Sequence, residues 1–213
     1  MIPSSHPYWH VRSLVQKNSE ISALSMSYYI YQPRNVSEKR DTWAISSSDF
    51  LNEDFVSKKI DLVPPTAELA LNSEFLCSDG KVYHLIMIDM ATGAKAHLDK
   101  LRSFLDNNLF GGIAWFNSGR SFHGYGTELL SHEQWVKFMG LLLLANLPNA
   151  VPTVDPRWIG HRLLAGYAAL RWTKNSHFYK SVPYRLDDSL TLKGSAKSDD
   201  ELGGRFNLYK SDN

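Results

Sequence analysis

The sequence predicts a single α/β (α+β) domain in which a mixed central sheet is flanked by helices. The 213 residues are 43% hydrophobic and 12% aromatic, which is enough to bury one core. The nearly continuous apolar stretch at 82–88 is typical of a central strand that is covered on both faces. Leucines at helical spacing follow it, so a strand leads directly into a helix. We assign this domain to residues 1–194 and expect the polar stretch 195–213 to be a mobile tail.

The N-terminal third contains two expected strands and one short expected helix. Residues 27–32 and 42–47 carry the β-branched and aromatic side chains of strands, and the polar loop between them indicates a hairpin connection. Residues 67–71 favour a short helix. The apolar strand at 82–88 ends at Asp89.

The middle of the chain predicts a helix followed by a second hairpin. Thr92 can serve as the N-cap of a helix whose apolar face recurs through Leu105. Residues 112–117 and 121–125 are expected strands, and Ser118-Gly119 is the turn between them.

The C-terminal part predicts two more helices and a strand. Ser131 and Gln134 have the spacing of a capping box, which opens a helix that runs to about residue 146. Asp155 followed by Pro156 is a favourable start for another helix. Residues 167–172 then return to strand-like composition.

Composition excludes several classes of protein. The single cysteine, Cys77, cannot form an internal disulfide, so we expect a reducing, cytoplasmic location. The first twenty residues lack the apolar core of a signal peptide. The most apolar run, 138–147, has roughly half of the about 20 residues that a membrane-spanning helix needs, so no membrane association is expected. The formal net charge of +1 gives no information about partners, and only local charge does.

One stretch of the chain is strongly basic. Residues 157–186 contain no acidic residue and mix cations with aromatic rings, which is typical of single-stranded nucleic-acid binding. The alternative is that the rings belong to the core and the cations to an ordinary solvated face. On the first interpretation, the candidate nucleic-acid ligands are Arg157, Arg162, Trp172, Lys174 and Arg185, and the candidate phosphate ligands are Arg171 and Lys180.

The glycine-rich segment 111–126 is also free of acids and indicates a phosphate site. The hydroxyls and amides of Ser118 and Ser121 can donate to phosphate oxygens, and Arg120 can add a bidentate contact. On a strand, Ser121 and His123 point to the same face. The alternative is that Ser118-Gly119 is only a hairpin turn and that His123 is a buried histidine with its hydrogen bonds satisfied.

Asp89 and Asp155 are the candidate metal ligands. Asp89 follows the apolar strand, and ligands of open α/β sheets usually bind at that end of a strand. A carboxylate there can hold Mg²⁺ for phosphoryl chemistry. Both residues also have a structural interpretation, because Asp89 can stabilise a turn and Asp155 can cap a helix.

In this order, the motifs resemble the catalytic core of the archaeo-eukaryotic primases and primase-polymerases over about residues 80–185. That superfamily carries an acid-x-acid pair at a strand end, then a Ser-x-His motif, then a third acid. The hexapeptide Ile86-Met87-Ile88-Asp89-Met90-Ala91 stands at the first motif, Ser118-Gly119-Arg120-Ser121-Phe122-His123 resembles the second, and Asp155 is the available third acid. Leu170-Arg171-Trp172-Thr173 is similar to the Arg-rich closing segment of mobile-element members.

The resemblance implies a nucleotidyltransferase that uses nucleoside triphosphates on a single-stranded template. It implies that Asp89, Asp155 and His123 are catalytic and that the two aspartates hold Mg²⁺ or Mn²⁺. Ala91 stands where the second acid is expected, which removes a metal ligand and leaves two alternatives open. One is a non-catalytic nucleotide- or nucleic-acid-binding module, and the other is a nuclease that uses His123 as general acid or base. The small size also leaves room for a helicase or another replication protein as a partner.

Overall fold

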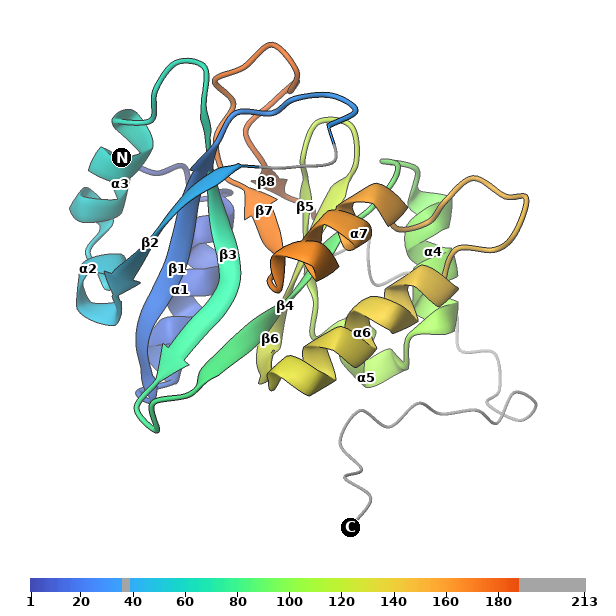
Figure 1. Ribbon diagram of the computed structural model, residues 1–213, viewed down its shortest axis with the longest axis horizontal. Helices are drawn as coiled ribbons and strands as arrows, with labels where there is room; N and C mark the ends of the chain where they lie inside the picture. The colour runs from blue at the N-terminus through green and yellow to red at the C-terminus, as the bar shows by residue number, and fades with distance from the viewer. Residues whose placement is uncertain (36–38, 188–213) are drawn as a thin grey trace.

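The computed structural model describes residues 1–35 and 39–187, which form an eight-stranded sheet with helices on both sides (Figure 1). The strands are β1 (Ile21–Tyr29), β2 (Arg40–Ser46), β3 (Glu68–Cys77), β4 (Val82–Asp89), β5 (Ala114–Asn117), β6 (Phe122–Leu130), β7 (Ala169–Arg171) and β8 (Tyr184–Arg185). The helices are α1 (Pro7–Lys17), α2 (Ser47–Leu51), α3 (Glu53–Asp61), α4 (Lys95–Phe104), α5 (Asn107–Gly111), α6 (His132–Leu144) and α7 (Pro156–Ala165).

The sheet has the order β2-β1-β3-β4-β6-β5-β8, and β7 pairs separately with β3. In Figure 1, α1 lies behind the sheet and α6 and α7 lie in front of it. The predicted single α+β domain with helices on both faces is confirmed. Every strand pair in the described part of the chain is antiparallel, whereas a mixed sheet was expected. The reason is that β1–β2, β3–β4 and β5–β6 pair with their sequence neighbours, and short or hairpin connections impose antiparallel pairing.

In the N-terminal third the structure both confirms and corrects the sequence-based expectations. The expected hairpin at 27–32 and 42–47 is present as β1 and β2. The short helix expected at 67–71 is wrong, because these residues lie in and next to β3 and pair with β1 and β7. The prediction failed because partners distant in sequence decide the conformation of this stretch. Helix α1, which the sequence did not indicate, begins where the His6 side chain accepts a hydrogen bond from the Tyr8 amide.

In the rest of the domain most element boundaries match the sequence pattern. The capping box of Ser131 and Gln134 is present, and Asp155 caps α7 with Pro156 at its first position. Thr92 is not an N-cap, because α4 begins after Ala94 and the Thr92 hydroxyl accepts from the Ala94 amide in the preceding turn. Strand β6 is longer than the expected 121–125 because it pairs with β4 as far as Leu130.

The hydrophobic core includes one residue that we expected at the surface. Trp172 is fully buried, its indole nitrogen donates to the Tyr125 hydroxyl, and its ring packs edge-on against His6. The prediction that Trp172 contacts nucleic acid is therefore wrong. The tail expected at 195–213 lies outside the described residues. Within the described part of the chain, no helix combines the length and the apolar character needed to cross a membrane.

Candidate functional site

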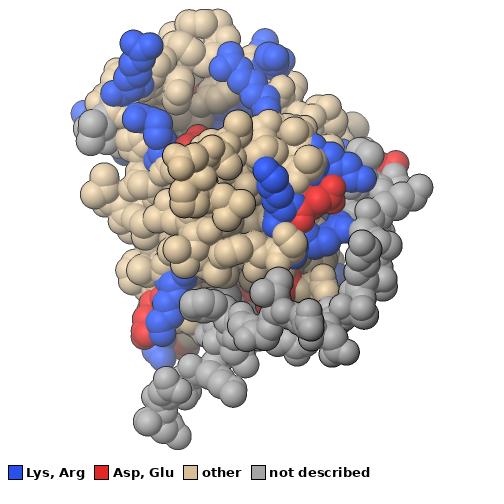
Figure 2. Space-filling model, turned by 90° about the vertical axis from the view of Figure 1, so that its right-hand side faces the viewer, with Lys and Arg blue, Asp and Glu red and all other residues tan. Residues whose placement is uncertain are grey.

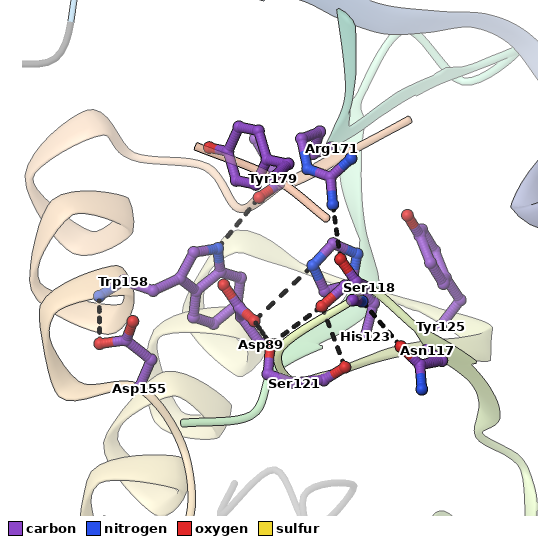
Figure 3. Close-up of polar contacts among 12 residues, drawn as sticks. Asp89, Asn117, Ser118, Ser121, His123, Tyr125, Asp155, Trp158, Arg171 and Tyr179 are labelled. Carbon is purple, nitrogen blue, oxygen red and sulfur yellow. Dashed lines mark hydrogen bonds and ion pairs between the residues drawn. The ribbon is translucent and has the colours of Figure 1, made fainter. Parts of the chain in front are cut away.

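Asp89 and His123 meet at the centre of the sheet. Strands β4 and β6 pair in a register that sets Asp89 directly opposite His123, and directly opposite residues share one face. His123 Nε2 lies 3.7 Å from Asp89 Oδ1 (Figure 3). His123 is only 5% exposed, and the side chain of Asp89 keeps 22% of its surface. The strand-end aspartate and the hairpin histidine therefore form one polar pair.

The surroundings of this pair disfavour charge on both of its members. Burial, together with the negative charge of Asp155, raises the pKa of Asp89 to about 8, although the Ser121 hydrogen bond and Arg171 oppose the shift. Burial and the positive charge of Arg171 hold the pKa of His123 well below its usual value. At neutral pH the carboxyl group is then largely protonated and the imidazole is neutral. A cation bound beside Asp89 would lower the pKa of this residue and favour its carboxylate form.

The turn between β5 and β6 is tied to Asp89 through its hydroxyl groups. The Ser118 amide donates to the Ser121 carbonyl over 2.9 Å, and the two serine hydroxyls lie 2.9 Å apart. The Ser121 hydroxyl donates in turn to Asp89 Oδ1 over 3.3 Å. Gly119 has a φ of 102°, which favours glycine, and a Cβ at this position would lie 3.0 Å from the Ser181 hydroxyl. The hairpin turn is present and reaches the candidate metal ligand, but His123 does not have its hydrogen bonds satisfied, because its Nδ1 has no partner among the described residues.

Asp155 both caps a helix and contacts the strand end at Asp89. Its Oδ1 accepts the Arg157 amide over 2.8 Å and the Trp158 amide over 3.2 Å, so it caps α7. Its own amide donates to the Asp89 carbonyl over 2.9 Å, beside the isolated bridge between Met90 and Val154. The helix cap that was predicted as the structural alternative is thus correct. The backbone hydrogen bond to the Asp89 carbonyl also brings Asp155 next to Asp89.

The number of carboxylates near Asp89 decides which kind of metal site this cavity could form. Ala91, two residues after Asp89, lies on the same side of the chain and lines the same cavity, so an acid there would join Asp89. Across the described ranges, no group of three or more His, Cys, Asp or Glu side chains is arranged to hold a metal. Mg²⁺ is usually bound by one or two carboxylates, with water and phosphate oxygens completing its shell. Asp89 and Asp155 match that mode in number, whereas the described residues form no cage of protein ligands alone.

These residues line a cavity of about 1080 Å³. Eight Lys and Arg residues line it against three acids, so an anionic guest is favoured. Figure 2 shows Lys and Arg side chains gathered around a hollow at the upper end of one face, with acidic atoms inside the hollow. The predicted cations that line the cavity are Arg120, Arg157, Arg162, Arg171 and Lys180.

Two predicted cations are not among the cavity residues. Lys174 is exposed and lies outside the cavity lining. Arg185 lies on β8, where its guanidinium carbon is 5.6 Å from the centre of the Phe116 ring, and it too is outside the lining. The structure therefore does not bring these two residues to the site with the others.

Arg171 reaches the cavity, but its contacts differ from those of a phosphate ligand. Its side chain is 4% exposed and donates to the backbone carbonyls of Thr173, Ser181 and Ser118, the last over 2.7 Å. Its guanidinium carbon also lies 4.0 Å from the centre of the Tyr179 ring. Arg171 thus joins β7, the β5–β6 turn and the closing segment at 173–181.

A buried glutamate that sequence reasoning missed orders the same closing segment. Glu68, at the start of β3, accepts from the Thr173 hydroxyl over 2.6 Å and from the amides of Asn175 and Ser176. It is 1% exposed, and these donors satisfy the hydrogen-bonding capacity of its buried carboxyl oxygens. Nothing local in the sequence around residue 68 indicates this role, because the donors lie more than 100 residues away.

Part of the cavity wall comes from a region to which we assigned no function. Arg34, Lys39 and Arg40 line the cavity, and so does Tyr31. The missed signal was the group of tyrosines at 28, 29 and 31 followed by Arg34, Lys39 and Arg40, which resembles the basic stretch at 157–186 in its rings and cations although it contains one acid, Glu38.

The antiparallel sheet, the paired aspartate and histidine and the basic cavity define an α+β protein that has a primase-like order of motifs and a cavity whose charge favours an anionic guest. A family model described as archaeo-eukaryotic primase 1D-like matches residues 47–184, which is more than half of the chain. The chain therefore belongs to this family, and the resemblance seen in the sequence is confirmed. The match begins well before residue 80, where we expected it to begin. Searches of curated proteins and of solved structures found no match.

Proposed function

We propose that this protein is a primase-polymerase-type nucleotidyltransferase that takes a nucleoside triphosphate into the basic cavity. The observation that carries the proposal is the Asp89–His123 pair, which lies in a cavity lined by eight cations and three acids. In the proposed reaction, a 3′-hydroxyl oxygen attacks the α-phosphorus and its proton passes to water, while the bond from the α-phosphorus to the bridging β-phosphate oxygen breaks and pyrophosphate leaves. Such a reaction needs positioning and charge neutralisation more than covalent chemistry by the protein.

The cations nearest to the turn support triphosphate binding. Arg120 and Lys180 are exposed cavity residues on segments that touch, since a Cβ on Gly119 would lie 3.1 Å from Lys180 Cβ. Both side chains are long enough to serve one triphosphate from two sides. Their part is to bind and orient the phosphates.

The floor of the cavity supports the choice of reaction. His123 Nδ1 is buried and has no hydrogen-bond partner among the residues that the structure describes, so the neutral imidazole has capacity for a further contact. Asp89 and Asp155 would hold Mg²⁺ or Mn²⁺, which when bound neutralises phosphate charge. The Ser121 hydroxyl fixes the orientation of the Asp89 carboxyl group.

A specific observation favours a second candidate function, a non-catalytic nucleotide-binding module. Ala91 leaves the expected second acid position without a carboxylate, and Asp155 already uses one oxygen to cap α7. Losing a metal ligand harms two-metal chemistry more than it harms phosphate binding by cations. Such a module would retain Arg120 and Lys180 as its phosphate contacts.

The test measures nucleotide incorporation and nucleotide binding in the same samples. The protein is incubated with a primed or unprimed single-stranded template, labelled nucleotides and Mg²⁺ or Mn²⁺. Asp89→Asn keeps the shape but cannot form the carboxylate that a bound cation would favour, and Asp99→Asn, at an exposed position of α4, is the matched control. We expect incorporation by the parent and by Asp99→Asn, and its loss in Asp89→Asn and His123→Gln.

Each other outcome points to a different conclusion. Nucleotide binding without incorporation by the parent supports the non-catalytic module. Breakdown of the template without added nucleotide supports the nuclease alternative, in which His123 is the general acid or base. If the parent neither binds nor incorporates nucleotides, the proposed function is wrong.

A further inference from the structure

The wall of the cavity formed by residues 28–32, 34–35 and 39–41 lies before the region that matches the family, which begins at residue 47. We propose that this wall and Phe178 form a platform that binds single-stranded nucleic acid by stacking its bases and contacting its phosphates. The inference rests on the proposed function in that the bound strand would be the template. The residues of the platform are Tyr31, Arg34, Lys39, Arg157 and Phe178.

Two segments far apart in sequence build the aromatic part of this platform. The ring centres of Tyr31 and Phe178 lie 5.2 Å apart, and those of Tyr31 and Tyr179 lie 5.8 Å apart. Beneath them, the hydroxyls of Tyr29 and Tyr179 are 3.0 Å apart, which fixes the two segments to each other. Tyr31 is 40% exposed although it contacts two rings. It therefore keeps surface on which a base can stack.

Cations accompany the rings at the same rim. Arg34, Lys39 and Arg157 are all exposed and all line the cavity. Arg157 Nη2 donates to the Asn35 carbonyl over 3.3 Å, which brings the start of α7 against the platform segment. Positive charge beside exposed rings is the combination that single-stranded nucleic acid requires, because its backbone needs cations and its bases need π-faces.

The size and charge of the cavity indicate more than one nucleotide. Its volume of about 1080 Å³ lies just above the range of about 300–1,000 Å³ that is typical of small-molecule sites. In the proposed function, Arg120 and Lys180 bind the triphosphate, which leaves the three platform cations for other phosphates. A duplex keeps its bases stacked inside, so rings on a cavity rim favour a single strand.

The experiment measures the binding of fluorescent oligonucleotides of about 16 nucleotides by anisotropy, because single-strand site sizes reach about that length. Single-stranded DNA, single-stranded RNA and a duplex are compared without nucleotide or metal. We expect Tyr31→Ala to weaken single-strand binding by about fivefold to a hundredfold, the range for one stacked base. Tyr31→Phe, which keeps the ring, should bind like the parent.

Matched controls separate the platform from general effects. Tyr184 is 44% exposed but lies on β8 outside the cavity lining, so Tyr184→Ala should change nothing. Phe178→Ala and Phe178→Leu, checked for folding by thermal melting, should both weaken binding because neither keeps a ring. A plot of log affinity against log salt has a negative slope. Arg34→Gln and Lys39→Gln should each make this slope less steep by about 0.7.

The outcomes distinguish this inference from the proposed function. The platform is overturned if single-strand binding is unchanged both in Tyr31→Ala and in those Phe178 variants that fold. It is also overturned if the parent binds the duplex more tightly than the single strands. Asp89→Asn should keep full oligonucleotide binding while losing incorporation. If instead the Tyr31 effect is present and the parent incorporates no nucleotide, the platform stands and the proposed reaction fails.

Discussion

Replacing Arg171 tests whether this residue holds the site together or binds phosphate. In the structure its guanidinium donates to three backbone carbonyls, those of Thr173, Ser181 and Ser118. Arg171→Met keeps the apolar stem and removes all three bonds. Hydrogen bonds to a charged group contribute about 1.5–3 kcal/mol each. They are not additive here because one side chain makes all three, and the cost of burying the guanidinium offsets part of the gain.

We therefore expect Arg171→Met to lower the free energy of unfolding by about 3–5 kcal/mol, and Arg171→Lys to lower it less. Urea denaturation gives this value from the midpoint and the slope. The exposed cavity residue Arg120 is the control, since Arg120→Met should stay within about 0.5 kcal/mol of the parent and yet weaken nucleotide binding. A loss below about 1 kcal/mol in Arg171→Met would refute the structural role and restore Arg171 as a candidate phosphate ligand.

Three further predictions concern the core, the response to acid and the missing acid. Trp172→Ala should lower the free energy of unfolding by about 3–5 kcal/mol in urea titrations, since Trp172 is fully buried; a near-neutral result would contradict its place in the core. Burial lowers the pKa of His6 from the usual 6.5 to about 4, so below pH 6.5 the unfolded chain takes up a proton that the folded chain refuses. As the pH falls from 6.5 to 4, His6 alone should lower the free energy of unfolding by up to about 3 kcal/mol. Above pH 6.5, His6 should not change the free energy of unfolding. His6→Gln should flatten that fall, and an identical pH dependence of the urea midpoint in both proteins would rule the assignment out. Ala91→Asp should tighten Mn²⁺ binding, followed by calorimetry, because residue 91 shares the side of Asp89; unchanged affinity would mean that the two positions do not share an ion.

The sequence predicted those parts of the site that depend on local chain geometry. The apolar run that ends at Asp89 located the strand end, and the alternation along β6 placed Ser121 and His123 on one face. The Asp155-Pro156 pair indicated the start of α7 because a cap and a first-turn proline are local features. These signals extend over only a few residues and can be seen without knowing the partners of the segment.

The contacts between distant segments could not be predicted in the same way. The pairing of β3 with β1 and β7 overrode the helical pattern at 67–71, and burial between α1 and β6 turned Trp172 into a core residue. The same holds for Arg171, whose partners are backbone carbonyls, and for Glu68, whose partners are the Thr173 hydroxyl and two backbone amides, because folding brings all of these groups close. A cation or a ring in a sequence looks the same whether it will bind a ligand or its own chain.

By itself, the sequence determined the fold class, the order of motifs that places the chain in its family, and the two residues that pair at the floor of the cavity. Only the tertiary structure decided which cations line that cavity and which of them are already engaged. It also brought the N-terminal segment around Tyr31 against Phe178. The physical reason is that strand ends and caps follow from neighbours along the chain, whereas burial and shared cavities follow from packing between distant segments, such as those 53 positions apart at Arg171 and Ser118 and 105 apart at Thr173 and Glu68.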